Sequence, residues 1–400
     1  MLAVLRNRPF ALLWVGRIVS RLGDGMYAVA LAWWLVQHAT GLARGQVLVA
    51  GLVPTLLLLL VGGVAVDRLP RIAVLLGCDA IRGLAVAAAG VLAQTGHLDL
   101  AELVVVAIVS GMCAAFFYPA SQAAVPDLVQ PPERPAANSL NRISAELAGI
   151  GGPPLGALAI AAGGTGTAFL ADAATFAVSG AAITLILGST AVRRPVPAAS
   201  SVLTGLVDGL RTVTRTPWLF VTIAIAGVSN LTLAGPEAVS LPFLVSRTVH
   251  GTALLYALVT AASAAGSVAV AVVLGHWKRL RRRGVAAYAS WLIAAVAVAS
   301  MGLLTSAATV VTAAAIFGAG IAGLELVWVS TLQDLVPAGV LGRVASVDAL
   351  GSYALLPVGY ALAGWATDRL GPPDVLLAGG LISALIVGLG FLHPDVREVD

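Results

Sequence analysis

Charged side chains are scarce in this chain of 400 residues, in which Asp, Glu, Lys and Arg make up only 10% of positions. Hydrophobic residues account for 59%, and the mean hydropathy is +0.97. A water-soluble domain of this length needs a polar surface that such a composition cannot supply. The lack of charge therefore excludes a soluble globular protein and indicates one embedded in a lipid bilayer.

Cysteine and the signatures of enzymes are also nearly absent. The two cysteines, Cys78 and Cys113, lie in apolar stretches, where small apolar packing is a commoner role than a disulfide or a metal pair. The sequence holds no HExxH, no GxSxG and no Walker phosphate loop, and its five histidines are scattered. We expect neither an enzyme nor a protein with a metal or cofactor.

What the chain does have is twelve apolar stretches, each long enough to cross a bilayer as a helix. A spanning helix needs about 20 apolar residues. The short alternating pattern of a membrane barrel is missing, so helices alone can satisfy the backbone. We therefore predict an all-α polytopic membrane protein with twelve transmembrane helices. They are residues 10–36, 45–66, 72–95, 101–124, 141–162, 166–189, 217–245, 252–275, 285–304, 308–331, 346–367 and 373–392.

Basic residues gather on one side of the predicted membrane. With twelve spans both termini lie on the same side, and most arginines fall there, including the run KRLRRR at 278–283. Only Arg44, Arg247 and Arg369 fall on the opposite side. Because short loops rich in Arg and Lys stay in the cytoplasm, we expect both termini to be cytoplasmic. The net charge of +4 then reflects orientation in the lipid bilayer, and no nucleic-acid partner is expected.

The chain divides into two similar halves. Its longest polar interruption, 191–216, predicts a cytoplasmic linker between an N-terminal six-helix bundle, 1–190, and a C-terminal one, 217–400. Residues 201–215 within the linker could form an amphipathic helix on the membrane surface. Nothing in the sequence demands more than a monomer.

Short segments of similar sequence occur in the two halves. The segment VPDLV around Asp127 resembles LQDLV around Asp334, and PPLG ending at Gly156 resembles LPVG ending at Gly359. The two pairs are separated by nearly the same length of chain. They indicate pseudo-symmetric six-helix bundles, and such halves rock around a central cavity to give alternating access.

The loop after the second span, GGVAVDRLPR at 62–71, resembles a signature of the major facilitator superfamily. The resemblance implies a cytoplasmic gate made by Gly63, Asp67, Arg68, Arg71 and Asp127. Glycine lets helix ends approach closely, and the arginines can bond a carboxylate. The alternative is a helix cap with a basic membrane anchor. The matching loop of the second half, 275–284, has lost the acid.

The fifth span carries GIGGPPLG, which resembles the antiporter motif of the same superfamily. Its residues Gly149, Gly152, Pro153 and Gly156 allow close helix approach and a bend. In the family this motif accompanies export by exchange; here Ala157 replaces one expected glycine. A closely packed, kinked helix is the plainer interpretation.

Further similarity runs along almost the whole chain, for example in LWVGRIVSRLGDGMYAVAL at 13–31 and LLPVGYALAGWATDRLG at 355–371. These segments look like the macrolide-efflux and enterobactin-exporter branch of the superfamily. The resemblance implies the major facilitator fold in a bacterial inner membrane. It also implies export of a drug or metabolite driven by the proton gradient.

Ionisable residues inside spans are candidates for proton coupling because lipid penalises them. Arg17, Arg21 and Asp24 stand at i, i+4 and i+7, so they share one face of the first span. We expect Asp24 to carry the proton and Arg21 to pair with it directly, and Arg21 and Arg17 either tune Asp24 or hold an anionic group of the substrate. The alternative is a static Arg21–Asp24 salt bridge.

Two further acids are weaker candidates. Asp172 in the sixth span could instead bond a hydroxyl such as that of Thr175, and Glu325 lies within the tenth span. Asp79 and Asp348 are set aside because they fall close to the predicted cytoplasmic boundary.

Aromatic and amide side chains within spans are the natural lining of a substrate cavity. A mostly apolar lining with few charges favours a small amphipathic organic substrate over a sugar. The alternatives to a proton-coupled exporter are a uniporter or importer, and a lysolipid flippase of the same fold. The candidates for the lining are Trp14, Tyr27, Phe117, Gln122, Asn230, Trp328 and Tyr353.

Overall fold

The regular elements of the described part of the chain are all helices. The structure, a computed structural model, describes residues 2–187, 202–276, 282–304 and 306–400, and no strand occurs among them. Nine segments of this described part are long and apolar enough to span a membrane. One of them, Pro131–Leu187, contains two predicted spans, and the two predicted spans outside the nine, 10–36 and 346–367, are helical as well. The polytopic all-α fold is confirmed.

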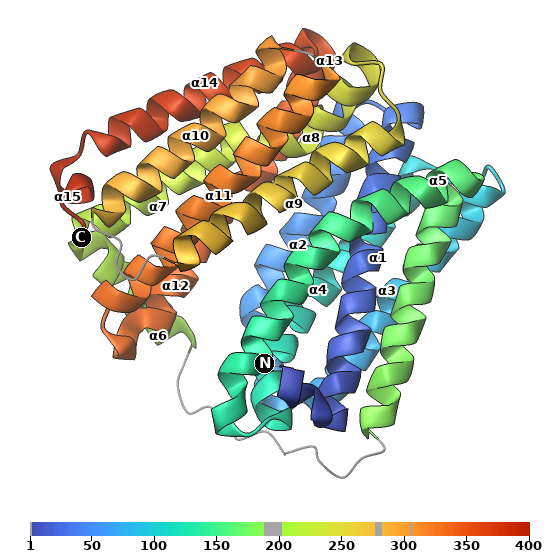
Figure 1. Cartoon of the computed structure of the whole chain (residues 1–400), viewed down its shortest axis with the longest axis horizontal. Helices are drawn as coiled ribbons and strands as arrows, with labels where there is room; N and C mark the ends of the chain where they lie inside the picture. The colour runs from blue at the N-terminus through green and yellow to red at the C-terminus, as the bar shows by residue number, and fades with distance from the viewer. Residues whose placement is uncertain (1, 188–201, 277–281, 305) are drawn as a thin grey trace. The chain divides into compact units, whose positions relative to one another are not determined.

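The chain forms two compact units, described here in turn. Unit 1 comprises Met1–Ala39 and Val47–Ala199. Both α1 and α3 pack along α5, and the three lie side by side in Figure 1. The helices of this unit are η1 (Leu2–Arg6), α1 (Arg8–His38), most of α2 (Gly41–Arg68), α3 (Arg71–Gln94), α4 (Leu100–Leu128), η2 (Pro131–Glu133) and α5 (Arg134–Leu187).

The fifth and sixth predicted spans form the single long element α5, which is broken at Gly163 and Gly164. Gly164 has φ +80, a left-handed conformation that residues with a Cβ avoid. The α-helical ladder is interrupted there, so the two spans meet at a glycine hinge without an intervening loop.

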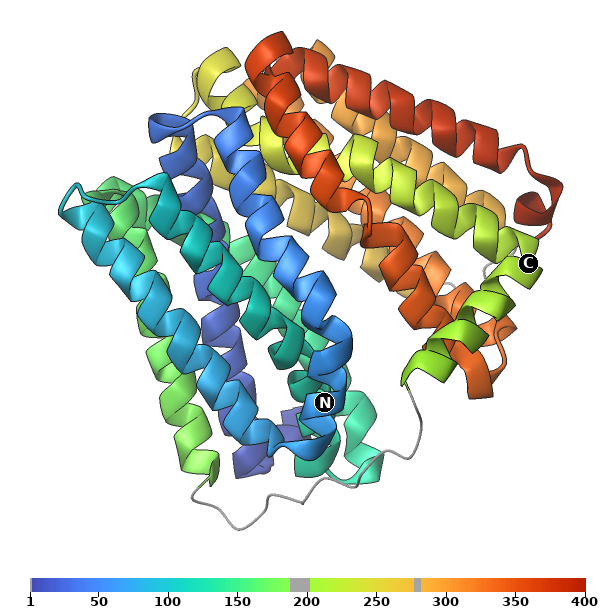
Figure 2. The ribbon, with the colours of Figure 1, turned by 180° about the vertical axis from the view of Figure 1, so that it is seen from behind.

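Unit 2 comprises Thr40–Gln46 and Ser200–Asp400. Figure 2 shows its α7, α13 and α14 from behind. The element α6 coincides with the helix predicted at 201–215, whereas positions 191–201 of the predicted linker lie outside the described residues. The helices are α6 (Val202–Arg215), α7 (Pro217–Ser229), the π-helical η3 (Asn230–Ala234), α8 (Gly235–Phe243), the π-helical η4 (Leu244–Thr248), α9 (Ala253–Gly275), α10 (Arg283–Leu303), α11 (Ala307–Leu335), α12 (Ala338–Tyr353), α13 (Leu356–Leu370), α14 (Pro372–Phe391) and α15 (Pro394–Arg397).

Two glycines make equivalent close contacts in the two units. A Cβ added to Gly156 in the fifth span would lie 2.8 Å from Met26 Cα in the first. A Cβ added to Gly359 in the eleventh span would lie 2.9 Å from Leu231 Cα in the seventh. The fifth span therefore meets the first as the eleventh meets the seventh. This is the relation expected of duplicated six-span halves.

Candidate transport site

An ion pair between α1 and α3 forms the centre of the charged cluster of unit 1. Arg82 of α3 pairs with Asp24 of α1, and its guanidinium carbon lies 4.5 Å from the centroid of the Phe176 ring. The Asp24 side chain is 42% exposed, whereas that of Arg82 is 18% exposed. The Asp24 carboxylate is therefore less enclosed by protein than the guanidinium with which it pairs.

Arg82 replaces the partner that the sequence predicts for Asp24. The predicted Arg21–Asp24 pair is wrong, because Arg21 Nη1 donates instead to the Asn141 carbonyl oxygen on α5, at 3.1 Å. Arg21 remains near Asp24, and Arg17 is half-buried on the same helix. Spacing along one helix places these side chains on a common face but says nothing about the guanidinium that a neighbouring helix supplies.

Two more acids lie near Arg82, and both are buried. Asp172 Oδ1 accepts a hydrogen bond from Thr175 Oγ1 at 3.3 Å, the partner considered for it above. Asp79 Oδ2 accepts one from Ser179 Oγ at 2.6 Å. Asp79 Oδ1 is buried without a hydrogen-bond partner in the described part of the chain. The Arg82 guanidinium therefore pairs with one carboxylate and lies within electrostatic reach of two more carboxyl groups.

Arg82 and Asp79 are the functional candidates that sequence reasoning missed. Asp79 was set aside as close to the boundary, yet it lies eight residues after the start of α3 at Arg71, or about 12 Å along the helix. Asp79 and Arg82 are three residues apart and share a helical face. An acid and an arginine three residues apart within the third predicted span are the sequence signal that could have identified both residues.

The other unit 1 candidates for the cavity lining all have partners in the structure. Trp14 Nε1 donates to Ser144 Oγ at 2.9 Å, and the Tyr27 ring lies 5.6 Å from that of Phe169. Phe117 packs against the apolar cluster that contains Phe10 and Leu13. Gln122 is exposed, and its Nε2 donates to Tyr118 Oη at 3.4 Å. Of these four, Tyr27 lies nearest the charged cluster, close to Asp24, Arg82 and Asp172.

Unit 2 contains a cavity of about 220 Å³ that brings together Asn230, Glu325, Trp328 and Tyr353. It also contains Asp348, which the sequence analysis set aside. Asp348 Oδ2 accepts a hydrogen bond from Trp328 Nε1 at 2.9 Å, and Oδ1 accepts one from Ser352 Oγ at 3.3 Å. The cavity is lined by Thr222, Ala226, Asn230, Leu233, Ala234, Trp291, Phe317, Ile321, Leu324, Glu325, Trp328, Asp348, Ala349, Ser352 and Tyr353.

Two interruptions of regular helix shape this cavity. The seventh predicted span changes to a π-helix at Asn230, and the eleventh breaks after Tyr353, before Pro357, which has no N–H to continue the ladder. Asn230 Nδ2 donates to the Ser352 carbonyl oxygen at 2.8 Å. The two irregular segments are thus tied together beside the cavity.

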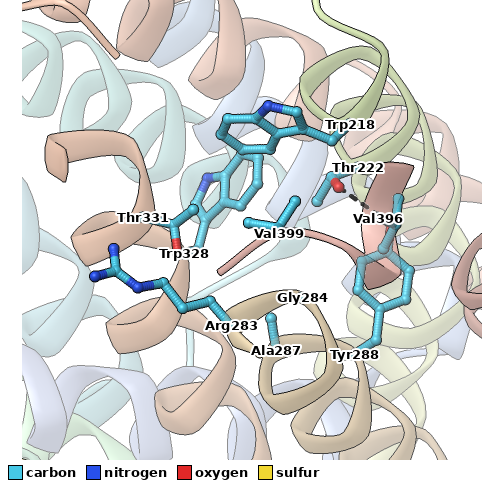
Figure 3. A pocket seen from close by; sticks show the side chains of 10 residues that line it. All are labelled: Trp218, Thr222, Arg283, Gly284, Ala287, Tyr288, Trp328, Thr331, Val396 and Val399. Atoms are coloured by element: carbon cyan, nitrogen blue, oxygen red, sulfur yellow. Dashed lines mark hydrogen bonds between the residues drawn. The ribbon is translucent and has the colours of Figure 1, made fainter. Parts of the chain in front are cut away.

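A second, much smaller pocket of about 20 Å³ shares Trp328 and Thr222 with the cavity. Figure 3 shows Trp218 next to Trp328, with ring centroids 5.7 Å apart, and Tyr288 facing Thr222. The two hydroxyl oxygens of Tyr288 and Thr222 are 3.1 Å apart. This volume is close to that needed by one water molecule. Trp328 therefore lines both the cavity and the smaller pocket.

Two residues of the predicted gate, Arg71 and Asp127, form an ion pair in unit 1, and unit 2 has an ion pair at the start of α10. The gate itself stays a prediction. Arg71 Nη1 lies 2.7 Å from Asp127 Oδ2 in unit 1, and Arg283 Nη1 lies 2.7 Å from Asp334 Oδ2 in unit 2. The second half therefore keeps this pair although its loop has lost the acid. The predicted gate residues Gly63, Asp67 and Arg68 lie outside the residues whose side chains are described.

The glycines of the antiporter-like motif bring two backbones together. A Cβ added to Gly152 would lie 2.8 Å from the Leu22 carbonyl oxygen, and Gly156 makes the contact with Met26 described above. Pro153 lies inside the helix beside them, and Gly149 is exposed. Three of the four motif residues thus belong to the contact of α5 with α1, the helix that carries Asp24.

Comparisons of sequence find relatives along almost the whole chain. The model of the family described as "Major Facilitator Superfamily" matches residues 13–359. The multidrug efflux pump Tap of Mycolicibacterium fortuitum is 30% identical over 406 residues, which cover 99% of this chain and 98% of that protein. The enterobactin exporter EntS of Shigella boydii serotype 4 is 26% identical over 97% of this chain and 94% of that protein.

Solved structures resemble the fold at low sequence identity. A bacterial homologue of the iron transporter ferroportin has a TM-score of 0.74 and 16% identity, with 96% of this chain and 99% of that one covered. A POT family transporter crystallised with 5-aminolevulinic acid has a TM-score of 0.74 and 13% identity, with 96% and 95% covered. At these identities the likeness shows the fold alone.

Proposed function

Because the chain belongs to the major facilitator superfamily, and is thus a multi-pass membrane transporter and not an enzyme, we propose that it exports a small amphipathic organic compound in exchange for protons. The similarity to a multidrug efflux pump and to an enterobactin exporter supports export. We further propose that it works as a monomer in the bacterial inner membrane with both termini in the cytoplasm. Reporter fusions at each terminus test this orientation.

The observation that supports proton coupling is the Arg82 guanidinium, which pairs with Asp24 and lies within electrostatic reach of Asp79 and Asp172. A proton that binds to the half-exposed Asp24 removes the negative charge which holds Arg82. The guanidinium is then attracted to the two buried acids alone. When the proton leaves, the Asp24–Arg82 pair forms again. Protonation thus switches the contact between α1 and α3.

This switch can be linked to alternating access. In the proposed cycle, the 1–190 and 217–400 bundles rock against each other, and 191–216 joins them. Asp24 lies on α1 between two backbone positions that contact Gly152 of α5, since a Cβ added to Gly152 would lie 2.8 Å from the Leu22 carbonyl oxygen and 3.0 Å from Gly25 Cα. A change in the charge of Asp24 therefore acts beside the close contact of α1 with α5. In this proposal Gly63, Asp67 and Arg68 act with the Arg71–Asp127 pair as the cytoplasmic gate.

The experiment is substrate-triggered proton movement in energised inverted vesicles across a panel of antibiotics, dyes and siderophores. Wild type is compared with Asp24→Asn, and Asp374→Asn is the matched control because Asp374 is an exposed acid in the first turn of α14. We expect proton release with wild type and the control, and none with Asp24→Asn. Release that persists in Asp24→Asn would move the carrier to Asp172, Asp79 or Glu325.

Two outcomes would overturn the proposed exchange. Transport of a compound without proton movement would indicate a uniporter or importer. Transfer of lysolipid between leaflets, again without proton movement, would indicate a flippase.

A further inference from the structure

The end of the chain folds back onto the start of α10. We call residues 394–400 the tail; its short helix α15 packs against α7, α10 and α14. Val396 is 1% exposed and Val399 is 9% exposed, and both line the small pocket of Figure 3. The tail is therefore packed into unit 2, although it follows the last predicted span, 373–392.

Two backbone hydrogen bonds join the tail to α10. The Gly284 N–H donates to the Val399 carbonyl oxygen at 3.2 Å, and the Arg282 N–H donates to the Asp400 carboxylate. Arg282 has φ 56, a left-handed conformation that is uncommon for residues other than glycine. Such a conformation persists where the surrounding structure holds it. The tail supplies one of the contacts that hold it here.

Gly284 also fits closely against the tail. A Cβ added to Gly284 would lie 1.8 Å from the Val396 carbonyl oxygen. Any residue with a Cβ at this position would therefore displace the tail. Together with the two hydrogen bonds, this contact places the tail against the residues on both sides of Arg283.

Arg283 carries the ion pair of unit 2. Its Nη1 lies 2.7 Å from Asp334 Oδ2 on α11, and its side chain is 19% exposed. The contact lacks hydrogen-bond geometry, since neither Nε nor Nη1 of Arg283 has a hydrogen-bond partner in the described part of the chain. The place of the guanidinium therefore depends on where the backbone of residues 282–284 puts it.

We infer that the tail is a positioning element for Arg283, which holds the backbone at Arg282 and Gly284 so that the guanidinium lies against Asp334. The inference rests on the proposed function, because Arg283–Asp334 is the unit 2 equivalent of the Arg71–Asp127 pair of the proposed gate. A ligand or protein that draws the tail away would release the ion pair of unit 2 and leave that of unit 1 intact.

Undocking the tail does not require any span to unfold. A helix of four residues is too short to be stable by itself, so α15 depends on its contacts with the bundle. Chain ends are also the parts of a fold that open at the least cost in free energy. The tail is thus suited to reversible release.

The test uses a cysteine as a reporter of Arg283. Asp334→Cys is introduced together with Cys78→Ala and Cys113→Ala, which remove the two native thiols. The thiolate is the reactive form of cysteine, and a neighbouring guanidinium favours it. Position 334 is reachable, because the Asp334 side chain is 57% exposed. The rate of alkylation by iodoacetamide at neutral pH, on purified protein in detergent, reports whether Arg283 lies against this position.

The full chain is compared with a chain that ends at His393. We expect the shorter chain to be alkylated at least about threefold more slowly. Arg283→Gln should slow the reaction by the same factor, and its combination with the truncation should slow it no further. Gly284→Ala, which displaces the tail without removing it, should act like the truncation. The control, Gly388→Ala, has nothing within 4 Å of the added Cβ and should leave the rate unchanged.

A second reporter makes the test specific to unit 2. Asp127→Cys, placed beside Arg71 in the same cysteine-free background, should react at one rate with and without the tail. An equal effect of the truncation at positions 127 and 334 would show that the tail only stabilises the whole fold, and would overturn the inference. Unchanged alkylation at position 334 would overturn it as well. If the truncated chain fails to fold, Gly284→Ala in the full chain decides.

Failure here is distinguishable from failure of the proposed export, because alkylation needs neither a substrate nor a proton gradient. Tail-dependent alkylation at position 334, in a protein that transports no compound of the panel, would support the positioning role and remove the export. Transport together with tail-independent alkylation would do the reverse.

Discussion

At the scale of single residues, Arg82 determines the electrostatics of unit 1. It pairs with Asp24, lies on the Phe176 ring and faces the buried Asp79 and Asp172. Acids grouped in a low-dielectric interior repel each other unless a cation or a proton compensates them. Arg82 supplies that compensation from within the cluster.

Removing Arg82 should therefore cost more stability than removing the charge of Asp24. Arg82→Gln leaves three acids without their shared cation, whereas Asp24→Asn leaves the guanidinium facing Asp79 and Asp172. We expect Arg82→Gln to unfold at the lower temperature in a thermal assay on detergent-solubilised protein. The double variant should be more stable than the sum of the two single changes predicts, by about 0.5–3 kcal/mol. Strict additivity would contradict the coupling.

Sequence reasoning found part of this cluster and could not have found all of it. Asp24 and Asp172 were predicted because an acid in an apolar span is costly. The pairing of Asp24 with Arg82 was not predicted, because periodicity shows which residues share a face of one helix. It does not show which side chain of a neighbouring helix lies against that face. The same gap explains why Asp348 was set aside: its place depends on Trp328, twenty residues earlier along the chain.

At the scale of helices, glycine sets the separation of α1 and α5. Gly156 should be intolerant of even one added methyl group, because its Cβ would meet the backbone of Met26 at 2.8 Å. We expect Gly156→Ala to lower stability by about 1–3 kcal/mol, as overpacking does. Gly77→Ala on α3 is the control, since nothing lies within 4 Å of that position. The control should be neutral or stabilising, because alanine favours helix. A loss at Gly77 equal to that at Gly156 would refute the packing argument.

The Arg71–Asp127 pair joins the start of α3 to the end of α4 and is partly buried, with side-chain exposures of 22% and 20%. Reversing one charge, as in Asp127→Arg, should reduce the initial rate of efflux at least about tenfold, because two like charges then face each other. The swap Arg71→Asp with Asp127→Arg should recover a substantial part of the rate, measured with a compound from the vesicle panel. The exposed pair Arg343–Asp208, at 43% and 53%, provides a control that should tolerate single reversals.

Helix positions were largely predictable, and helix irregularities were not. Each of the twelve apolar runs coincides with helix in the described part of the chain, although the eleventh is interrupted after Tyr353. The π-helical turn at Asn230 and the left-handed conformation of Gly164 depend on the packing of the surrounding helices, which amino-acid composition does not determine. The π-helical turn shapes the cavity of unit 2, and Gly164 joins the fifth and sixth spans.

At the scale of the whole molecule, α2 belongs to both units. Its first residues, within Thr40–Gln46, are part of unit 2, and its continuation from Val47 is part of unit 1. Asp368 of α13 accepts hydrogen bonds from the backbone N–H groups of Gly41 and Leu42, at 2.7 and 2.8 Å. The buried Arg44 donates to the Ala238 carbonyl oxygen at 2.9 Å. The predicted bundles 1–190 and 217–400 stay a prediction, and hydropathy does not reveal that Thr40–Gln46 groups with unit 2.

Asp368 acts as the N-terminal cap of α2, supplied by a distant part of the chain. Asp368→Ala should destabilise the protein by about 0.5–2 kcal/mol, because two backbone donors at a helix start lose their acceptor. Thermal unfolding measures this effect, with Asp374→Ala as the control at another helix start. An unfolding temperature equal to that of the control would show that water replaces the carboxylate at no cost.

The sharing of α2 has a consequence for anyone who divides this protein into parts. A fragment cut at the linker and expressed as residues 200–400 would lack its seven-residue insert. The glycine surface of α13 at Gly364, where an added Cβ would lie 2.6 Å from the Gly41 carbonyl oxygen, would then be bare. Such a fragment would require complementation by a peptide spanning 36–50, or by the other half supplied in trans. The two halves can therefore be produced separately only if the C-terminal one is supplied with Thr40–Gln46.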